Sequence, residues 1–395
     1  MKIVQINSVY GIGSTGKIVK DIHNLLMESS HESFVFYGRG KKVKEKSIKK
    51  TSNIMSVLLD ILITRLFNLH GFANFFNTKK LIRELENINP DVVHLHNLHG
   101  YYTNYRLLFK YLKQKNIPIV WLLHDQWAFS GGTAYFSESI NWENISTQDI
   151  IKYSKKYPAY IYMGFDNTKY IYEIKKKLFD YEKLIFITPS KWLYDCLMDS
   201  TIPNINAKVI YNGIDTNLFK ENKISFDNKI KILGVANIWN ERKGLKYFNQ
   251  LARDLDPNKF TITIIGKLVN DSCSIDPRIN YVERLESQET LAEYYSDADI
   301  FINTSTVDNF PTTILEAQSC GTPVITFDTG GSSESLLFKE DVILSDNYNQ
   351  LLQKLLTKGK KNEETSRALV NHMKNFDRKV MYENYVKLYS QITGG

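Results

Sequence analysis

The sequence predicts an α/β protein made of two domains, each a doubly wound parallel sheet covered by helices. The chain has 395 residues, a length typical of two or three domains. Short apolar strands alternate with amphipathic helices through residues 1–215, and the same alternation restarts after the polar, charged stretch 216–229. The change of composition at 216–229 is therefore the expected domain boundary.

The first half of the chain carries the strand and helix pattern of one such domain. Strands are expected at 2–6, 35–37, 91–96, 119–124, 184–188 and 208–211, and helices at about 17–28, 81–88, 107–115 and 191–198. Residues 54–76 are apolar at helical spacing, and residues 126–180 have the weakest periodicity, which leaves their elements unassigned.

The second half repeats the pattern. Strands are expected at 231–235, 261–265, 300–302 and 323–327, with the sheet ending near 344, and helices at 244–255, 291–296, 312–319, 348–357, 364–375 and 378–392.

Composition and cysteine usage exclude several classes of protein. Hydrophobic residues make up 43% of the chain, which is enough for sizeable cores. The chain starts with a short apolar strand and a glycine loop, so no signal peptide is expected, and no run of about 18 uncharged apolar residues predicts a transmembrane helix. Cys196, Cys273 and Cys320 stand far apart, which argues against disulfides and structural zinc and fits the reducing cytoplasm.

Residues 308–331, DNFPTTILEAQSCGTPVITFDTGG, form a loop, a helix, a strand and a second loop in one unit. The helix expected from Thr312 would present unpaired N–H groups and a partial positive charge, which suits a phosphate. Asp308 precedes that helix and Glu316 lies within it. Phosphate flanked by carboxylates that bind hydroxyls is what a nucleotide-sugar requires, although Asp308 alone could equally cap the helix.

Two further segments offer groups for a phosphate. Arg242 and Lys243 stand at the start of a helix, where they are either phosphate ligands or a solvated pair. Residues 11–17 match the GxxxxGK pattern, but Ile18 stands where ATP hydrolysis needs Ser or Thr, so an ATPase is not expected. The glycine loop either brings its N–H groups close to a ligand or is only a tight turn.

Histidines follow two of the expected strands. His94, His96 and His99 could suggest a metal, but no carboxylate pattern completes a site, so no metal is predicted. His124 ends a buried strand and precedes a polar loop, as either a ligand or a buried core histidine.

Positive charge is concentrated in the first half. Residues 1–215 hold 28 Lys and Arg against 19 Asp and Glu, a net of +9, and residues 39–50 alone hold seven basic residues and one acidic residue. This run lacks the aromatic pattern and the recognition helix of nucleic-acid binders, so no nucleic acid is predicted. Together with 54–76 it suits an anionic membrane surface, or it is a solvated loop followed by a core helix.

The 308–331 stretch resembles the donor-binding signature of family-four retaining glycosyltransferases of the GT-B type. The usual pattern is Glu-x7-Glu followed by Gly-Thr-Pro-Val; Asp308 replaces the first Glu and Glu316 keeps the second. Residues 209–215 are similar to the interdomain segment of that family. Residues 95–100, 123–127 and 188–193 resemble a subgroup that builds bacterial surface polysaccharides.

The resemblance implies two Rossmann-like domains that face each other across a cleft. Residues 1–215 would take the acceptor, residues 216–376 would bind the nucleotide-sugar, and the helix in 377–395 would pack back on the first domain. The implied reaction is retaining, metal-independent transfer from a UDP- or GDP-linked sugar to a glycan or lipid-linked acceptor, with no cofactor. The implied location is the cytoplasm, with peripheral contact to the inner face of the membrane.

The resemblance also implies the site residues. The catalytic residues would be His124, Lys243 and Asp308. The family has an arginine near the position of Asn237, which is not basic, so Arg242 would supply the second cation. The donor-binding residues would be Gly13, Gly16, Asn237, Arg242, Lys243, Asn309, Phe310, Pro311, Thr312, Thr313, Ile314 and Glu316.

Two alternatives remain open at this point. A GT-B nucleotide-sugar epimerase would convert the donor without an acceptor. A non-catalytic protein that binds nucleotide or nucleic acid would show no turnover.

Overall fold

The computed structural model describes residues 1–136, 140, 142, 144–222, 228–269 and 274–394. The chain divides into two compact units: residues 1–210 with the segment from Tyr382 onward, and Tyr211–Met381. Each unit contains one parallel sheet, which confirms the predicted α/β class with two Rossmann-like domains. Cys273 and part of the predicted 216–229 boundary lie outside the described residues.

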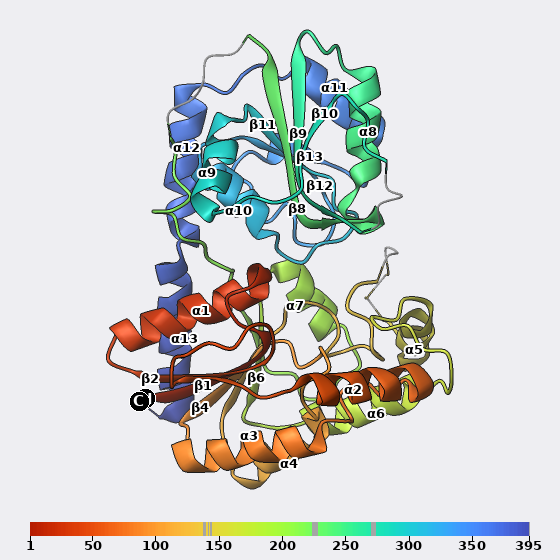
Figure 1. The fold of residues 1–395 in the computed structure, drawn as a ribbon, viewed down its shortest axis with the longest axis vertical. Helices are drawn as coiled ribbons and strands as arrows, with labels where there is room; N and C mark the ends of the chain where they lie inside the picture. Colours follow the sequence, from red (N-terminus) through yellow and green to blue (C-terminus); the bar gives the residue numbers. More distant parts are fainter. Residues whose placement is uncertain (137–139, 141, 143, 223–227, 270–273, 395) are drawn as a thin grey trace. The chain divides into compact units, whose positions relative to one another are not determined.

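The sheet of the first unit has seven parallel strands in the order β3-β2-β1-β4-β5-β6-β7 (Figure 1). The strands are β1 (Lys2–Val9), β2 (Glu32–Arg39), β3 (Ile48–Lys50), β4 (Val92–Leu95), β5 (Ile119–Leu122), β6 (Leu184–Thr188) and β7 (Ala207–Val209). Strands β4, β5 and β6 are buried along their whole length, which is why each reads as an apolar run in the sequence.

Helices cover both faces of this sheet. They are α1 (Gly13–Glu28), α2 (Ile54–Phe67), α3 (Phe75–Ile88), α4 (Tyr105–Gln114), α5 (Thr147–Lys156), α6 (Thr168–Phe179), α7 (Lys191–Met198) and most of α13 (Arg378–Thr393). On one face, Val19 of α1 packs against Val35 and Tyr37 of β2. On the other, α3 and α4 join a cluster with alternate residues of β1, such as Val4 and Ile6.

Residues 54–76 do not form a core helix, so that interpretation is wrong. Helix α2 ends at Asn68, which has a left-handed φ of 48°, and Gly71 at φ 76° turns the chain before α3. A Cβ on Gly71 would lie 2.6 Å from Cδ1 of Tyr105, so only glycine fits there. The residues that α2 buries are polar, Asp60 and Thr64. Apart from Arg65, its large exposed side chains are apolar: Ile54, Met55, Leu58, Leu59, Leu62, Leu66 and Phe67.

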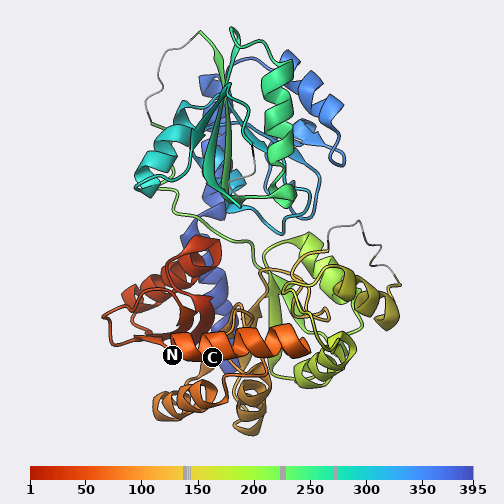
Figure 2. The same ribbon diagram turned by 45° about the vertical axis from the view of Figure 1, so that its right-hand side comes forward.

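The sheet of the second unit has six parallel strands in the order β10-β9-β8-β11-β12-β13. They are β8 (Ile230–Trp239), β9 (Phe260–Leu268), β10 (Ile279–Val282), β11 (Ile300–Asn303), β12 (Val324–Phe327) and β13 (Val342–Ile343). The helices are α8 (Leu245–Asp254), α9 (Gln288–Asp297), α10 (Thr312–Ser319), α11 (Tyr348–Thr357) and α12 (Glu363–Met373). Figure 2 shows this sheet between the teal helix α9 and the green helix α8.

Each sheet has one topological switch point, where the order of the strands reverses direction. In the first unit it lies between β1 and β4, and in the second between β8 and β11. Ligands of doubly wound sheets bind at such a switch point, beyond the carboxyl ends of the strands. The loops that follow these strands are therefore where each unit is expected to hold a ligand.

Candidate functional site

A basic pair and a carboxylate meet at the switch point of the second unit. Lys243, in the loop after β8, places Nζ 2.5 Å from Oδ2 of Asp308, in the loop after β11. Nη1 of Arg242 lies 3.7 Å from the same oxygen and donates to the carbonyl of Val307 at 2.7 Å. The structure thus brings together Lys243 and Arg242, which the sequence analysis assigned to donor binding, and Asp308, which it assigned to catalysis.

The loop after β8 is held by one of its own side chains and by one from the loop after β11. Asn240 accepts a hydrogen bond from the backbone N–H of Lys243 at 3.0 Å, and Thr304 donates from Oγ1 to the Lys243 carbonyl at 2.9 Å. Gly244 has φ 74°, and a Cβ there would lie 2.4 Å from the Thr304 carbonyl oxygen. Glycine after the basic pair is thus required for the close approach of the two loops.

Asp308 is buried and charged. Burial opposes its ionisation, but the charges of Lys243 and Arg242 and the hydrogen bonds from Lys243 and the Asn309 N–H hold its pKa below the ordinary value. Its backbone carbonyl accepts from the N–H of Gly331 at 2.9 Å, and a Cβ on Gly330 would lie only 1.9 Å from that oxygen. The Gly-Gly turn of the signature therefore packs directly against the backbone of Asp308.

Helix α10 begins beside this cluster. Its N-cap, Pro311, has no side chain that could hydrogen-bond the first turn. The N–H of Ile314 donates to the Pro311 carbonyl at 3.1 Å, so this predicted phosphate donor is already engaged. The N–H groups of Thr312 and Thr313 precede it and have no acceptor inside the helix, because a helix leaves its first N–H groups unpaired.

Glu316 lies in the second turn of α10 and is almost buried, at 8% exposed. Its Oε2 accepts a hydrogen bond from the hydroxyl of Tyr295 on α9 at 2.9 Å. The sequence analysis did not identify Tyr295, because nothing in the spacing of 295 and 316 shows that α9 and α10 meet.

Phe310 and Ile314, two of the predicted donor-binding residues, cannot act through a side chain in this cluster, and Asn237 stands apart from it. Phe310 stacks on Tyr211, with ring centroids 5.2 Å apart, and belongs to an apolar core, as does Ile314. Asn237 is exposed where the register of β8 shifts between Val235 and Ile238, and it makes no hydrogen bond to the described part of the cluster. Phe310 can contribute only its backbone, and the N–H of Ile314 is already bonded to the Pro311 carbonyl.

The first unit places the predicted glycine loop at the end of β1. The N–H of Gly11 donates to the carbonyl of Gly16 at 2.8 Å, which closes the loop. A Cβ on Gly16 would lie 3.1 Å from both the Gly11 nitrogen and Cγ2 of Val9, so the space there suits glycine. Gly13 has φ 65°, a backbone conformation that favours glycine, and opens α1.

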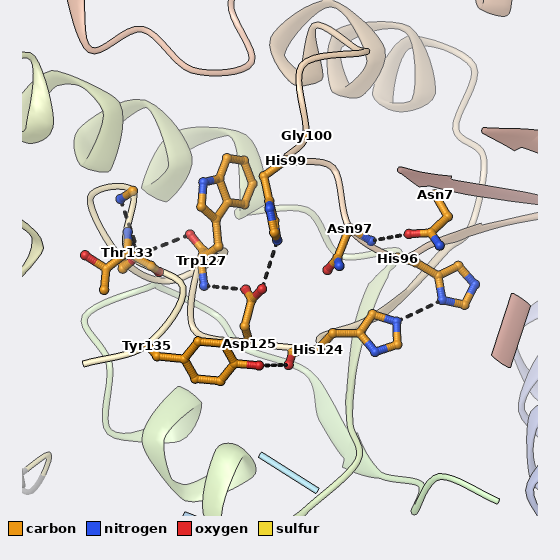
Figure 3. Close-up of polar contacts among 12 residues, drawn as sticks. Asn7, His96, Asn97, His99, Gly100, His124, Asp125, Trp127, Thr133 and Tyr135 are labelled. Atoms are coloured by element: carbon orange, nitrogen blue, oxygen red, sulfur yellow. Dashed lines mark hydrogen bonds and ion pairs between the residues drawn. The ribbon is translucent and has the colours of Figure 1, made fainter. Parts of the chain in front are cut away.

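Strand alternation gathers three polar residues on one face of the first sheet. The core under α3 and α4 contains Val4 and Ile6 of β1. It also contains Leu95 and Leu123, the residues that directly precede His96 and His124. Gln5, His96 and His124 have the opposite parity, so they point to the α1 face. Nδ1 of His96 lies 3.3 Å from Nε2 of His124 (Figure 3), and Nε2 of His96 lies 3.2 Å from Oε1 of Gln5.

Both histidines are neutral near pH 7. Burial lowers the pKa of His124 to about 4, with a smaller upward contribution from Asp125. Burial and the neighbouring histidines hold the pKa of His96 well below its usual range.

Asp125 and His99 form a second pair, shown beside the first in Figure 3. Nε2 of His99 lies 2.9 Å from Oδ2 of Asp125, and the N–H of Trp127 donates to Oδ1 at 2.9 Å. Burial would raise the pKa of Asp125, but the charge and hydrogen bond of His99 and the Trp127 N–H lower it overall. The sequence analysis missed Asp125, although it directly follows His124.

The HxHxxH triplet is divided in the structure. The rings of His94 and His96 stack with centroids 4.2 Å apart, while His99 pairs with Asp125. Within the described residues, no group of three or more His, Cys, Asp or Glu is placed to hold a metal ion. Among the same residues, no helix has the length and apolar character needed to cross a membrane.

Two Rossmann-like units, one with a basic pair, a carboxylate and a helix N-terminus at its switch point, are typical of the GT-B class. Comparison with family models makes this specific. Residues 15–218 match the model described as Glycosyltransferase Family 4, and residues 229–358 match Glycosyl transferases group 1. The first match spans more than half of the chain, so the protein belongs to glycosyltransferase family 4.

Individual relatives agree with this assignment. The chain is 27% identical over 369 residues, 85% of each chain, to the "Putative colanic acid biosynthesis glycosyl transferase WcaC" of Escherichia coli (strain K12). It is 25% identical over 183 residues to the N,N'-diacetylbacillosaminyl-diphospho-undecaprenol alpha-1,3-N-acetylgalactosaminyltransferase of Campylobacter jejuni, 44% of this chain and 48% of that one. The crystal structure of Anabaena HepE in complex with UDP superposes with a TM-score of 0.60 at 14% identity, covering 99% of this chain and 100% of that one, and supports the fold alone.

Proposed function

We propose that this glycosyltransferase moves a sugar from a UDP- or GDP-linked donor to a lipid-linked acceptor during synthesis of a surface polysaccharide, with retention of configuration and without a metal. The observation that carries the proposal is the convergence of Lys243 and Arg242 on Asp308 beside the start of α10. The relatives WcaC and the C. jejuni transferase support the polysaccharide and the lipid-linked acceptor, respectively, through their own named activities.

The chemistry follows from the leaving group. The bond from the anomeric carbon to the phosphate oxygen breaks, and its electron pair leaves with the nucleoside diphosphate. The acceptor hydroxyl oxygen forms the new bond to the anomeric carbon, and its proton passes to the leaving diphosphate. Lys243, Arg242 and the N–H groups of Thr312 and Thr313 would stabilise the negative charge that develops on the diphosphate. These groups supply positive charge to the diphosphate without a metal ion.

The two carboxylates have separate roles in this proposal. Glu316, oriented by Tyr295, would accept hydrogen bonds from the ribose hydroxyls of the nucleotide. Asp308 would accept from hydroxyls of the transferred sugar. Asp is one methylene shorter than the Glu usual at this position, and Lys243 and the Gly330–Gly331 turn fix where its carboxylate lies.

A thermal-shift screen of UDP, GDP and their sugars, followed by NMR of the donor with and without acceptor, tests the proposal. We expect a stabilising nucleotide and transfer that requires an acceptor. Conversion of the donor without an acceptor would mark an epimerase, and oligonucleotide binding without donor turnover would mark a nucleic-acid binder; either result would overturn the proposal. The glycosyltransferase family match favours neither alternative.

We further propose that helix α2 docks the protein on an anionic membrane. The usual burial pattern is reversed in this helix. It buries the polar residues Asp60 and Thr64 and exposes large apolar side chains such as Leu58 and Leu62, which are 54% and 52% exposed. A short helix that exposes apolar side chains suits the plane of a membrane interface, not a span.

Basic residues lie in the segment that leads into α2, including Lys41, Lys42, Lys44 and Lys46. Their charge complements anionic headgroups, at about 1 kcal/mol per basic residue near the surface. Because the attraction is screened by salt, the charged and apolar contributions can be separated.

Vesicle flotation distinguishes the two contributions. The double variant Leu58→Gln, Leu62→Gln should lose binding to phosphatidylcholine–phosphatidylglycerol vesicles at every salt concentration, because it removes buried apolar area. The variant with Gln at Lys41, Lys42, Lys44 and Lys46 should lose binding mainly at low salt.

The matched control changes two exposed leucines of the second unit, Leu344 and Leu356, to Gln. It should bind vesicles as the parent does. If the α2 variant kept full vesicle binding and instead dissociated a dimer, the apolar face would be a contact between two copies and the membrane proposal would be wrong.

A further inference from the structure

A hydrogen-bonded chain runs through the first unit to His124. Nε2 of Gln5 donates to the carbonyl of Val19 at 3.2 Å, and Oε1 of Gln5 lies 3.2 Å from Nε2 of His96. Nδ1 of His96 then lies 3.3 Å from Nε2 of His124. Gln5 and His96 are at most 1% exposed, whereas His124 is 9% exposed, so the chain leads from the interior toward the surface.

The direction of this chain follows from what each atom can donate. If the Gln5 amide were turned over, its oxygen would face the carbonyl oxygen of Val19, and two acceptors would meet without a hydrogen. The amide oxygen therefore faces His96, where it can only accept. His96 must then carry its proton on Nε2, and because the ring is neutral, its Nδ1 is an acceptor.

His124 completes the sequence of donors. It donates from Nε2 to Nδ1 of His96, and because its ring is also neutral near pH 7, its own Nδ1 keeps a lone pair. That Nδ1 makes no hydrogen bond to any other residue in the described part of the chain. His124 Nδ1 is therefore an acceptor at the end of the chain nearest the surface, where it can bind a hydrogen-bond donor of a ligand.

We propose that Gln5 and His96 are positioning residues that fix His124 as the Nε2-protonated tautomer, so that His124 Nδ1 accepts a hydrogen bond from a hydroxyl of the sugar substrate. The inference rests on the proposed function, because it names the sugar group that His124 recognises. A directed acceptor favours a neutral sugar with a hydroxyl at this place. It disfavours a sugar that places a carboxylate there, because two acceptors would then meet.

The tautomer can be measured without turnover. In the protein labelled with ¹⁵N-histidine, two-bond and three-bond ¹H–¹⁵N spectra at pH 7.5 distinguish a protonated from an unprotonated ring nitrogen, and the variant His124→Gln identifies the His124 signals. We expect protonated Nε2 and unprotonated Nδ1. A protonated Nδ1 on His124 in the parent protein would overturn the inference with no need for any further variant.

Gln5→Met removes the amide at similar side-chain length, so His96 loses the acceptor that fixes its proton. The His124 signals should then report a mixture of tautomers, and kcat/KM should fall on the order of tenfold, the cost of one misdirected hydrogen bond. The affinity for free UDP or GDP should not change, since neither carries the sugar. An unchanged His124 tautomer in folded Gln5→Met would show that Gln5 has no such role.

Tyr389→Phe is the matched control. The Tyr389 hydroxyl lies 2.6 Å from Nδ1 of His94, the ring that stacks on His96, but it is not part of the chain from Gln5 to His124. This variant should keep the parent tautomer of His124. If no donor reacted with the parent, the proposed function would be wrong, but the tautomer measured by NMR would be unaffected. Failure of the proposed function can therefore be distinguished from failure of the tautomer inference.

Discussion

Lys243 Nζ lies 2.5 Å from Asp308 Oδ2, so the cation that we assign to the diphosphate is paired with the carboxylate that we assign to the sugar. The pair joins residues from two loops at the strand switch point of the second unit. A bound donor would have to share this contact or displace it.

Lys243→Ala should raise the barrier to transfer by about 2–4 kcal/mol, the value of one lost donor to a developing anion. It should also weaken binding of the nucleoside diphosphate. Asp308→Asn should bind UDP or GDP at least as tightly as the parent, because it releases Lys243 from a competing carboxylate, while transfer slows. Titration calorimetry and initial rates measure both effects, and equal losses of nucleotide affinity in the two variants would contradict the assignment.

Glu316→Gln should weaken binding of the free nucleotide by about 1.5–3 kcal/mol, because charged hydrogen bonds to the ribose hydroxyls are lost. Tyr295→Phe keeps the carboxylate but removes the hydroxyl that orients it, so its loss should be smaller and in the same direction. Calorimetry with UDP and GDP compares the two variants. A larger loss in Tyr295→Phe than in Glu316→Gln would show that Glu316 does not contact the nucleotide.

EDTA should leave the transfer rate unchanged once donor and acceptor are purified. The reason is that, in the proposed mechanism, Lys243, Arg242 and two helix N–H groups supply the positive charge that a divalent ion would otherwise bring. Initial rates with EDTA and with added Mg²⁺ or Mn²⁺ test this. Loss of turnover that Mg²⁺ or Mn²⁺ restores would show that the proposed mechanism is wrong.

Asp60→Asn should stabilise the protein at pH 8 and have little effect near pH 4. Burial raises the pKa of Asp60 to about 7, although hydrogen bonds from Asn74 and Gly71 partly oppose it. In the unfolded parent, Asp60 ionises above the ordinary pKa of an aspartate, whereas in the folded parent it stays protonated. The stability of the parent therefore falls as pH rises toward 7. The neutral amide of the variant has no such penalty.

The stability difference between Asp60→Asn and the parent should therefore grow by about 1.4 kcal/mol per pH unit up to pH 7 and then level off. Urea unfolding at a series of pH values measures it. A difference independent of pH would mean that Asp60 is ionised in the folded protein throughout this range.

Most of the fold could be predicted because buried parallel strands are apolar along their whole length. β6 and α10 begin and end at the predicted residues. The strands β3 and β10 were missed because they pair on one side only, at sheet edges, and carry exposed polar residues such as Lys49 and Asn280. The sequence left a membrane-surface helix and a core helix both open for α2, because apolar residues occur around most of the helix and the sequence does not tell which side meets the protein.

The candidate site could be predicted only in part. The start of α10 was visible because its loop, helix and carboxylates are contiguous in the sequence. The contact of Lys243 with Asp308 joins residues 65 positions apart, and that of Gln5 with His96 joins residues 91 apart, so no local pattern reports them. The strand alternation that puts Gln5, His96 and His124 on one face was available, but the strand order needed to bring them together was not.

The first unit is assembled from both ends of the chain, and this sets an order of events during protein synthesis. Tyr385 and Tyr389 are fully buried, and Tyr389 reaches His94 at the centre of the first sheet. When the ribosome has synthesised residues 1–210, it must still add residues 211–381 before it reaches this segment. That takes roughly ten to thirty seconds of elongation. For that time the sheet face that carries His94 lacks α13, so the apolar surface that α13 covers is open to a chaperone.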